Sequence, residues 1–470
     1  MSASMHAVSR TMNHPAAALA TPAALDLHTF TDPVAMRALL QQRLPGFAEG
    51  WLRIDALRVC KVRRNASLHR NPCPLSLCFE LQVSDLARGH AGTQWLYAKV
   101  FRTGLAEPFF QQQDRSRLTA PAFGAALVHL PALNLVVWAL PNDPGLPQLT
   151  QLLDPAQAER VLPWAALTAA MGMARGAFGA VQVELLRYEP QQRATLRYTV
   201  ARADGSAACV LYAKTFCDAQ AQDIHRRFDH FWQRAQTDAD APLVAQPLGH
   251  SPALQTLWQA AAPGAALTQS LAPSNAAALM RGVARALARL HAAPLAPSAN
   301  ATRHSAAHWV AEARRRQTKL SRADPALAAR VARVADTIGA HVGHQARRPS
   351  SLIHGDFHPD QVWVHEGRIV LFDFDEFTLG DPMQDLATFV LKLEPAGAAP
   401  ELGSALLDAY AACAPHRFDQ RSLNWHLTVQ SLVQTSRAFV FQAPDWASEI
   451  ERRLARCEAH AAALNLEPTP

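Results

Sequence analysis

Hydrophobic and polar residues alternate along two stretches in the first half of the chain. In 75–83, apolar side chains occupy every second position, and 194–200 (ATLRYTV) has the same two-residue period. This period is typical of a β-strand with one buried face, because successive side chains of a strand point to opposite sides. We therefore expect antiparallel sheets in this half of the chain.

From residue 275 the apolar spacing lengthens to three or four residues. Leu279, Val283, Leu287 and Leu290 fall on one face of a helix. The same spacing predicts further helices over 309–342 (two helices, separated near Asp324), 386–393, 402–410, 423–441 and 446–464. The second half is therefore expected to be mainly helical, and the Pro- and Ala-rich segment 240–275 is expected to hold a hinge between lobes.

A six-residue phrase occurs twice in the strand-rich half. LYAKVF at 96–101 recurs as LYAKTF at 211–216, and each copy is followed by a Pro-Ala-Leu turn and then a tryptophan. Lys99 and Lys214 are 115 residues apart, and Trp138 and Trp258 are 120 apart. This spacing predicts an internal repeat of about 115–120 residues. Each unit, roughly 40–160 and 172–280, is expected to contain a strand, a hairpin ending in the lysine strand, a helix and a strand pair.

The stretch 351–387 combines acidic residues with short apolar runs. A His-Gly-Asp sequence ends at Asp356, and Gln361 follows five residues later. The apolar runs 362–364 and 368–372 are separated by a turn that contains glycine, which predicts a β-hairpin.

Four further aspartates follow this hairpin. Asp373 and Asp375 come at the end of the second run, while Asp381 and Asp385 lie in a Gly-Asp-Pro-x-x-Asp phrase that opens an apolar helix. A phosphoryl-transfer site needs a carboxylate for the proton of the attacking hydroxyl and oxygen ligands for Mg²⁺. We expect Asp356 and Asp373 to supply these groups, and Asp381 and Asp385 to have structural roles.

This order of groups resembles the aminoglycoside phosphotransferase and choline kinase superfamily, which has a protein-kinase-like fold. The resemblance rests on the His-Gly-Asp phrase, the following His358-Pro pair, the five-residue step to Gln361, the hairpin and the Gly-Asp-Pro-x-x-Asp tail. One position departs from the pattern, because the family usually has asparagine where this chain has Gln361. The resemblance implies an α+β bilobal fold, with an antiparallel-sheet N-lobe and a helical C-lobe, preceded here by an N-lobe-like repeat.

The resemblance also implies a function: an ATP- and Mg²⁺-dependent transfer of the γ-phosphate to a hydroxyl of a small molecule. Lys214, in the unit next to the acidic stretch, would contact the nucleotide phosphates, with Asp223 as its nearest acidic partner. The first unit, with Lys99, would be non-catalytic. The expected site residues are Asp356, His354 and His358 for the acceptor hydroxyl and its loop, Lys214 and Asp223 for the nucleotide, and Gln361, Asp373 and Asp375 for Mg²⁺.

These expectations divide the chain into four parts. Residues 1–26, which lack the continuous apolar segment of a secretory signal, are expected to form a disordered tail. Residues 27–160 would form the repeat that resembles a kinase N-lobe, 161–262 the nucleotide-binding N-lobe, and 263–470 the helical C-lobe with the catalytic loop and acceptor pocket. In the last of these, Trp425, His426, Gln430 and Arg437 are candidates to line the acceptor pocket.

Composition narrows the possible partners and compartment. The formal net charge is +6, but the arginines that dominate it are dispersed along the chain, which does not favour nucleic-acid binding. No apolar run is long enough to cross a membrane. Seven cysteines without a Cys-x-x-Cys pair are typical of a reduced, cytoplasmic protein.

Two alternatives belong to other classes. A pseudokinase or nucleotide-binding regulatory module is suggested by Gln361 and by the turn at 189–193, which has no glycine where a phosphate-covering loop is expected. Antibiotic resistance would need an acidic pocket for polycationic drugs, and the C-terminal helices carry about as many basic as acidic groups. Turnover of Mg·ATP would separate the enzyme from the binding module.

Overall fold

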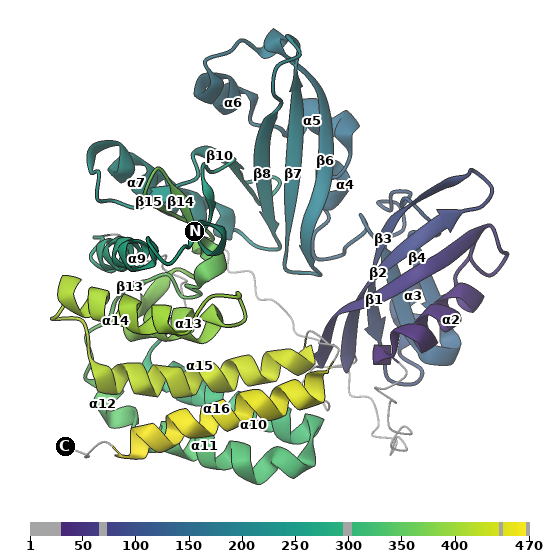
Figure 1. The fold of residues 1–470 in the computed structure, drawn as a ribbon. Helices are drawn as coiled ribbons and strands as arrows, with labels where there is room; N and C mark the ends of the chain where they lie inside the picture. The colour runs from purple at the N-terminus through teal and green to yellow at the C-terminus, as the bar shows by residue number, and fades with distance from the viewer. Residues whose placement is uncertain (1–29, 65–72, 295–302, 441–444, 467–470) are drawn as a thin grey trace, which may run out of the picture.

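The computed structural model describes residues 30–64, 73–294, 303–440 and 445–466, and it has three lobes (Figure 1). Two lobes are built on antiparallel sheets and the third on helices, so the expected α+β, protein-kinase-like architecture of a sheet lobe followed by a helical lobe is confirmed. The expected disordered tail, 1–26, lies outside the described residues.

The first sheet lobe is a five-stranded antiparallel sheet with two short helices. Its elements are α2 (Pro33–Arg43), β1 (Leu52–Arg64), β2 (Leu75–Asp85), β3 (His90–Val100), α3 (Ala106–Gln111), β4 (Leu127–Leu130) and β5 (Leu135–Ala139). The alternating apolar residues of β2 are buried, as the two-residue period predicts. They pack in one core with Met36 and Leu40 of α2, whose N-terminus is capped by Asp32.

The second sheet lobe follows through three short helices. Its elements are α4 (Leu149–Leu152), α5 (Ala158–Val161), α6 (Trp164–Met171), β6 (Phe178–Glu189), β7 (Arg193–Arg202), β8 (Cys209–Phe216), α7 (Gln220–Thr237), β10 (Pro247–Ser251) and β11 (Thr256–Ala260). Lys214 lies on β8, the central strand, and Lys99 lies on β3, the central strand of the first sheet.

The two sheets have the same strand order. The first is β1-β2-β3-β5-β4, and the second, read from its other edge, is β6-β7-β8-β11-β10. The Pro-Ala-Leu turns also correspond: Asn134 and Gln255 both have φ of 47°, and their carbonyls accept hydrogen bonds from the N–H groups of Phe101 (2.8 Å) and Phe216 (3.0 Å). This agrees with the pattern on which the repeat was predicted, and duplication itself stays a prediction.

The two tryptophans used to define the repeat are not equivalent in the sheets. Trp138 lies across from Tyr97 in β3, two residues from the lysine, whereas Trp258 lies across from Ala213 in β8, next to the lysine. Because adjacent strand positions face opposite sides, Trp138 shares the face of its lysine and Trp258 does not. One extra residue between turn and tryptophan in β5 causes the difference.

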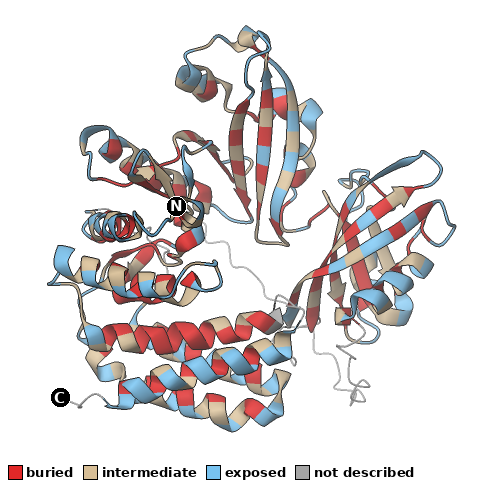
Figure 2. Ribbon diagram, viewed as in Figure 1, coloured by how far each residue is buried: buried red, intermediate tan, exposed pale blue. Residues whose placement is uncertain are grey.

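The helical lobe completes the molecule and carries two small sheets. Its helices are α8 (Leu267–Ser270), α9 (Ala276–His291), α10 (Ala306–Ala323), α11 (Ala328–Ala340), α12 (Val342–Ala346), α13 (Met383–Leu393), α14 (Glu401–Cys413), α15 (Gln420–Val440) and α16 (Trp446–Leu466), and its strands are β12 (Ala265–Ala266), β13 (Ser351–Ile353), β14 (Val362–His365), β15 (Arg368–Leu371) and β16 (Thr378–Gly380). The α9 leucines predicted on one face are all buried, and α15 is buried along most of its length (Figure 2).

The segment 240–275, expected to be a hinge, contains strands of both neighbouring lobes. Its first strand, β9 (Leu243–Val244), pairs in parallel with β15 of the helical lobe. The next two, β10 and β11, complete the second sheet. The chain therefore passes between the two lobes twice within this range, between β9 and β10 and between β11 and β12, and a hinge there stays a prediction.

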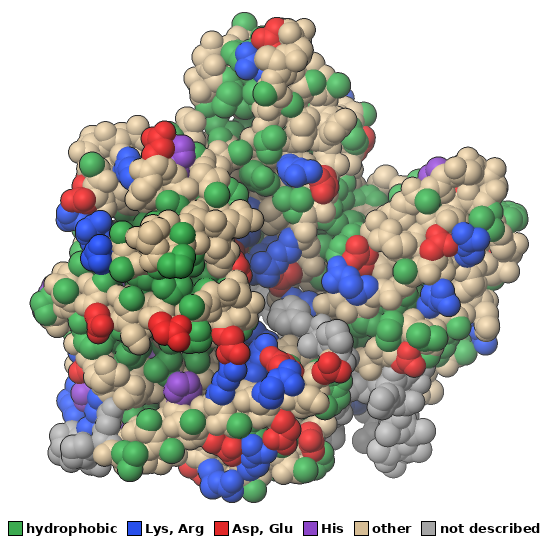
Figure 3. Space-filling view, in the orientation of Figure 1, with side chains coloured by type: hydrophobic (Ala, Val, Ile, Leu, Met, Phe, Trp, Pro, Cys, Tyr) green, Lys and Arg blue, Asp and Glu red, His purple; other side chains and the backbone are tan. Residues whose placement is uncertain are grey.

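The first sheet lobe touches both other lobes. The end of β1 contacts α15 of the helical lobe (Figure 1), and Lys61 of β1 pairs with Glu189 of β6 at 2.7 Å. Basic side chains gather at the hollow between the lobes (Figure 3). Among the described residues no helix is long and apolar enough to cross a membrane. All seven cysteines are free thiols.

Candidate active site

The His-Gly-Asp loop between β13 and β14 is held in place by Asp385 of α13. The Asp385 carboxylate accepts the backbone N–H of His354 (2.7 Å) and of Gly355 (2.9 Å), and it also contacts His291 at 3.0 Å. The His354 ring contributes a further bond, donating from Nε2 to the carbonyl of Phe372 at 2.6 Å. His354 therefore ties the loop to the end of β15, behind the site.

The middle residue of this loop must be glycine. Gly355 has φ of +87°, and a Cβ added there would lie 2.2 Å from the carbonyl oxygen of Glu376. A side chain is excluded both by this contact and by the left-handed backbone. The close approach brings Asp356 next to the segment that follows β15.

Asp356 is ionised because Lys392 lies beside it. Burial alone would raise the pKa of Asp356, but the Lys392 ammonium, at 3.0 Å, and Arg437 bring this pKa below its ordinary value. His358 lies on the other side, with Nε2 3.8 Å from the carboxylate. Burial lowers the pKa of His358 to about 4, so its imidazole is neutral at pH 7.

Asp373 and Asp375 converge on Lys214. The Lys214 Nζ lies 2.6 Å from Oδ1 of Asp373 and 2.6 Å from Oδ2 of Asp375, and Arg193 contacts the same oxygen of Asp375 at 2.6 Å. Burial opposes ionisation of Asp373, but Lys214 holds its pKa well below the ordinary value. The backbone of Asp373 is left-handed, with φ of 57°, a conformation that non-glycine residues rarely adopt and that is found at functional sites.

Gln361 contacts the second oxygen of Asp373. Its amide nitrogen lies 3.2 Å from Asp373 Oδ2, and the two ends of an amide side chain are interchangeable by rotation. A rotated Gln361 would present its carbonyl oxygen beside this carboxylate, a donor pair that suits Mg²⁺. The part of the chain that the structure describes contains no group of three or more His, Cys, Asp or Glu side chains placed to hold a metal.

Asp223 does not take the place expected of it. It lies on α7 and pairs with Arg226 on the same helix, whereas the Lys214 ammonium lies between the two aspartates after β15. The expectation of an α7 partner for this lysine is replaced by Asp373 and Asp375. The Asp375 carboxylate contacts Lys214 and Arg193, whereas Asp373 and Gln361 contact each other, so the metal donors that fit are Asp373 and Gln361.

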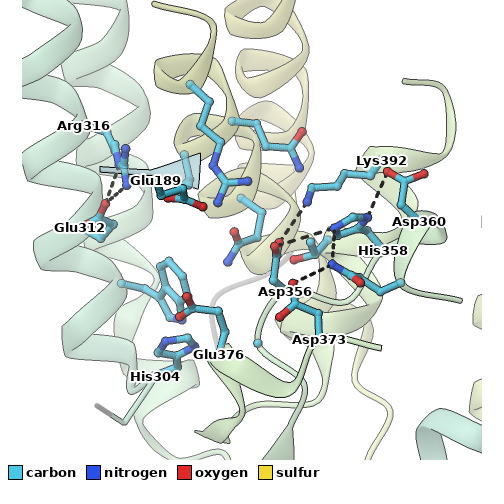
Figure 4. Close-up of a pocket in the computed structure, with 18 of the residues that line it drawn as sticks. Glu189, His304, Glu312, Arg316, Asp356, His358, Asp360, Asp373, Glu376 and Lys392 are labelled. Carbon is cyan, nitrogen blue, oxygen red and sulfur yellow. Dashed lines mark hydrogen bonds and ion pairs between the residues drawn. The ribbon is translucent and has the colours of Figure 1, made fainter. Parts of the chain in front are cut away.

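A cavity of about 720 Å³ joins these residues between the lobes (Figure 4). Of the expected site residues, Asp356, His358, Gln361 and Asp373 line it, while His354, Lys214 and Asp375 lie behind its wall. The cavity extends along α10 and α15. Its other charged or polar lining residues include Arg187, Glu189, Arg193, His304, His308, Glu312, Arg316, Glu376, Lys392, Gln430, Gln434 and Arg437.

Two of the four acceptor-pocket candidates line this cavity. Gln430 and Arg437 are on its wall, whereas Trp425 and His426 are buried in the helical core. Trp425 packs in the helical core, where its ring nitrogen donates to the carbonyl of Ile338 at 3.0 Å. His426 is buried one turn of α15 before Gln430, so neither of the two lines the cavity. Sequence reasoning missed Lys392, whose only signal was that the chain has just five lysines.

Comparison with known proteins finds one matching family model. Residues 197–425 match the model of the phosphotransferase enzyme family. No curated protein matches the chain.

Several solved structures are similar to about two thirds of the chain. A thermostable mutant of the aminoglycoside phosphotransferase APH(4)-Ia in apo form is 17% identical, with a TM-score of 0.45 over 64% of this chain and 98% of that one. The same enzyme in a ternary complex with AMP-PNP and hygromycin B is 18% identical, with a TM-score of 0.44 over 64% and 97%. ADP-bound APH(2'')-Ib is 13% identical, with a TM-score of 0.42 over 63% and 98%.

Proposed function

We propose, from the premise that residues 197–425 match the model of the phosphotransferase enzyme family, that this protein transfers the γ-phosphate of ATP to a hydroxyl group of a small molecule. The observation that carries the proposal is that Asp356 and Asp373, from opposite ends of the β14–β15 hairpin, line one cavity. An ionised carboxylate for the hydroxyl proton and a second carboxylate for the metal are what phosphoryl transfer requires.

Asp356 is the group that receives the acceptor proton. The acceptor oxygen forms a bond to the γ-phosphorus while the bond from that phosphorus to the bridging oxygen of ADP breaks, and the hydroxyl proton passes to the Asp356 carboxylate. Lys392 fixes this carboxylate at 3.0 Å. His358 lies beside the Asp356 carboxylate and, being neutral at pH 7, adds no charge there.

Lys214, Asp373 and Gln361 form the nucleotide side of the site. Lys214 would contact the phosphates, and Asp373 with Gln361 would hold Mg²⁺, which neutralises charge on the phosphate oxygens when bound. Since Lys214 touches both aspartates, it would fix the position of Asp373 before the nucleotide arrives.

The lobes divide this work as follows. We assign nucleotide binding to 161–262 and the catalytic loop and acceptor pocket to 263–470, whereas 27–160 takes no direct part in the chemistry. The acceptor would enter along α10 and α15, beside Gln430 and Arg437. Seven free cysteines fit a reducing compartment, and we propose the cytoplasm.

A turnover assay tests the proposal. Purified protein with Mg·ATP and pools of sugars, amino alcohols and aminoglycosides is followed by ³¹P NMR for a new phosphate monoester. Wild type should give one, whereas Asp356→Asn and Asp373→Asn should each lower turnover by about 10²-fold or more. Asp223→Asn, which removes only a carboxylate paired with Arg226 on the same helix, should leave turnover unchanged.

The alternative, a nucleotide-binding regulatory module, is favoured by one observation: Lys214 already neutralises Asp373 and Asp375. In the same assay, ATP binding without transfer to any pool, and without loss on Asp356→Asn, would select the module over the enzyme.

A further inference from the structure

A second cavity, of about 240 Å³, lies between the first sheet lobe and the β6–β7 hairpin. Its floor consists of two adjacent rows of residues across the strands β1, β2 and β3. The first row is Lys61, Cys78 and Tyr97, and the second is Arg63, Ser76 and Lys99.

These two rows form a polar face of the first sheet, opposite the face that packs in the apolar core. Positions two apart on a strand share a face, so all six side chains project to the same side. The residues between them, Val62, Leu77 and Ala98, are buried in the apolar core on the other side. The sheet therefore presents three basic side chains to one small cavity.

Lys99 has no counter-charge there. Within the described parts of the chain no carboxylate lies within 4.0 Å of its ammonium. Its nearest surroundings are the rings of Tyr97, Phe109 and Trp138, with centroids 5.7–5.9 Å away. Burial lowers the pKa of Lys99. A half-buried cation without a partner is costly unless an anion joins it.

The two nearby carboxylates are already engaged. Glu189 pairs with Lys61 at 2.7 Å and with Arg193 at 3.1 Å. Asp143 accepts hydrogen bonds from the Tyr188 hydroxyl (2.7 Å) and the Gln191 N–H (2.8 Å). Glu189 is therefore shared between two cations, whereas Asp143, which is bonded to neutral donors, acts on Lys99 only from beyond 4.0 Å.

The remaining wall is the tip of the β6–β7 hairpin, Pro190 and Gln191. The Gln191 side chain accepts the hydroxyl of Tyr97 at 2.8 Å, and its backbone approaches Gly145 so closely that a Cβ there would lie 2.6 Å from the Gln191 Cα. The first sheet lobe thus holds this tip firmly, and the hairpin separates the second cavity from the candidate active site.

We propose that this cavity binds a small phosphate-bearing anion. Lys61, Arg63 and Lys99 supply the charge, and the Ser76 hydroxyl supplies a hydrogen bond to a phosphate oxygen. The volume is below the range of about 300–1,000 Å³ typical of drug-sized ligands, so the ligand is phosphate, pyrophosphate or the monophosphate of a small alcohol. The proposal does not depend on phosphotransferase activity.

Selective labelling provides a direct test, because the chain has only five lysines. Backbone amide signals of ¹⁵N-lysine are recorded in a Lys214→Gln background, which removes the phosphate-contacting lysine of the other site. Inorganic phosphate, then pyrophosphate, is titrated at constant ionic strength. The signals of Lys61 and Lys99 should shift saturably with a Kd below about 1 mM, while that of Lys319 should not.

Lys99→Gln and Arg63→Gln should each weaken binding by about tenfold or more. Arg88→Gln, an equal loss of charge at the far turn of the same sheet, is the matched control and should have no effect. Unmoved Lys61 and Lys99 signals, or equal losses with Arg88→Gln, would overturn the proposal. Acetate binding as tightly as phosphate would overturn the assignment to phosphate.

Discussion

At the scale of single residues, the charge on Asp356 depends on one lysine that no motif indicated. Lys392 projects from α13 and contacts the carboxylate at 3.0 Å. The resemblance predicted Asp356, Gln361 and Asp373 because they follow one another at the family's spacing within a single stretch of chain. It could not predict Lys392, because helical spacing does not say which face of α13 meets the loop.

Replacing Lys392 should slow the chemical step without weakening nucleotide binding. Lys392→Met is expected to lower kcat by about 10–100-fold, since the carboxylate loses the cation that positions it, and to leave the Kd for Mg·nucleotide unchanged. Steady-state kinetics and calorimetric titration check the two parts. Lys319→Met, on the exposed face of α10, is the control, and an equal fall in kcat for both variants would contradict the role given to Lys392.

Gly355 should tolerate no side chain. Gly355→Ala is expected to lower the free energy of unfolding by about 2 kcal/mol or more, because the Cβ meets the carbonyl of Glu376 and the backbone is left-handed. Urea denaturation measures the change. Gly343→Ala, where a Cβ meets nothing within 4 Å, should cost nothing; a smaller loss at Gly355 than at Gly343 would refute the argument.

At the scale of elements, the turn at 189–193 substitutes ionic contacts for the missing glycines. Lys61 pairs with Glu189, Glu189 with Arg193, and Arg193 with Asp375. This row of charges runs from β1 to the segment after β15. The strands and helices themselves were predictable from their periods. The pairs Lys61–Glu189 and Arg193–Asp375 were not, because their members lie more than a hundred residues apart and leave no local signal.

Arg193 should therefore matter far more than its neighbour on the same strand. Arg193→Gln is expected to cost about 3 kcal/mol of unfolding free energy, because it leaves the buried Asp375 carboxylate with Lys214 alone. Arg197→Gln breaks an exposed pair with Glu184 and should cost less than about 1 kcal/mol. Thermal or urea unfolding of the two variants compares them, and equal losses would contradict the account.

At the scale of the whole molecule, the position of the first sheet lobe was the feature that sequence could not give. The repeated LYAK phrase predicted a second sheet of the same order, and the strands have that order. The first sheet lobe contacts α15 and the β6–β7 hairpin. The hairpin contacts depend on side chains such as Lys61 and Tyr97, which the hydrophobic pattern of the sequence does not distinguish.

Buried histidines in the helical lobe should make the protein sensitive to acid. Burial lowers the pKa of His426 to about 4; the positive charge of Arg348 also lowers it, and the carboxylates of Asp381 and Asp385 raise it. Burial, together with the neighbouring His308, lowers the pKa of His304 to about 4 as well. The unfolded chain takes up these protons near pH 6.5 and the folded protein does not. Stability is therefore complete above about pH 6.5 and falls as the pH drops towards 4.

His426→Gln should remove one of the protons that the unfolded chain takes up near pH 6.5. Between pH 6.5 and 4, the free energy of unfolding should fall less steeply than in wild type, by about 1.4 kcal/mol per pH unit. Urea denaturation across this range measures the slope. The exposed His416→Gln should keep the wild-type slope, and an unchanged slope for His426→Gln would show that this histidine does not couple folding to pH.

The most direct test of the central claim, that Asp356 and Asp373 meet at one metal–nucleotide site, is an EPR titration of Mn²⁺ with AMP-PNP. Wild type and Asp356→Asn should bind the Mn²⁺–nucleotide complex, whereas Asp373→Asn should bind it at least about tenfold more weakly. Nucleotide binding that neither needs the cation nor responds to Asp373→Asn would contradict the account.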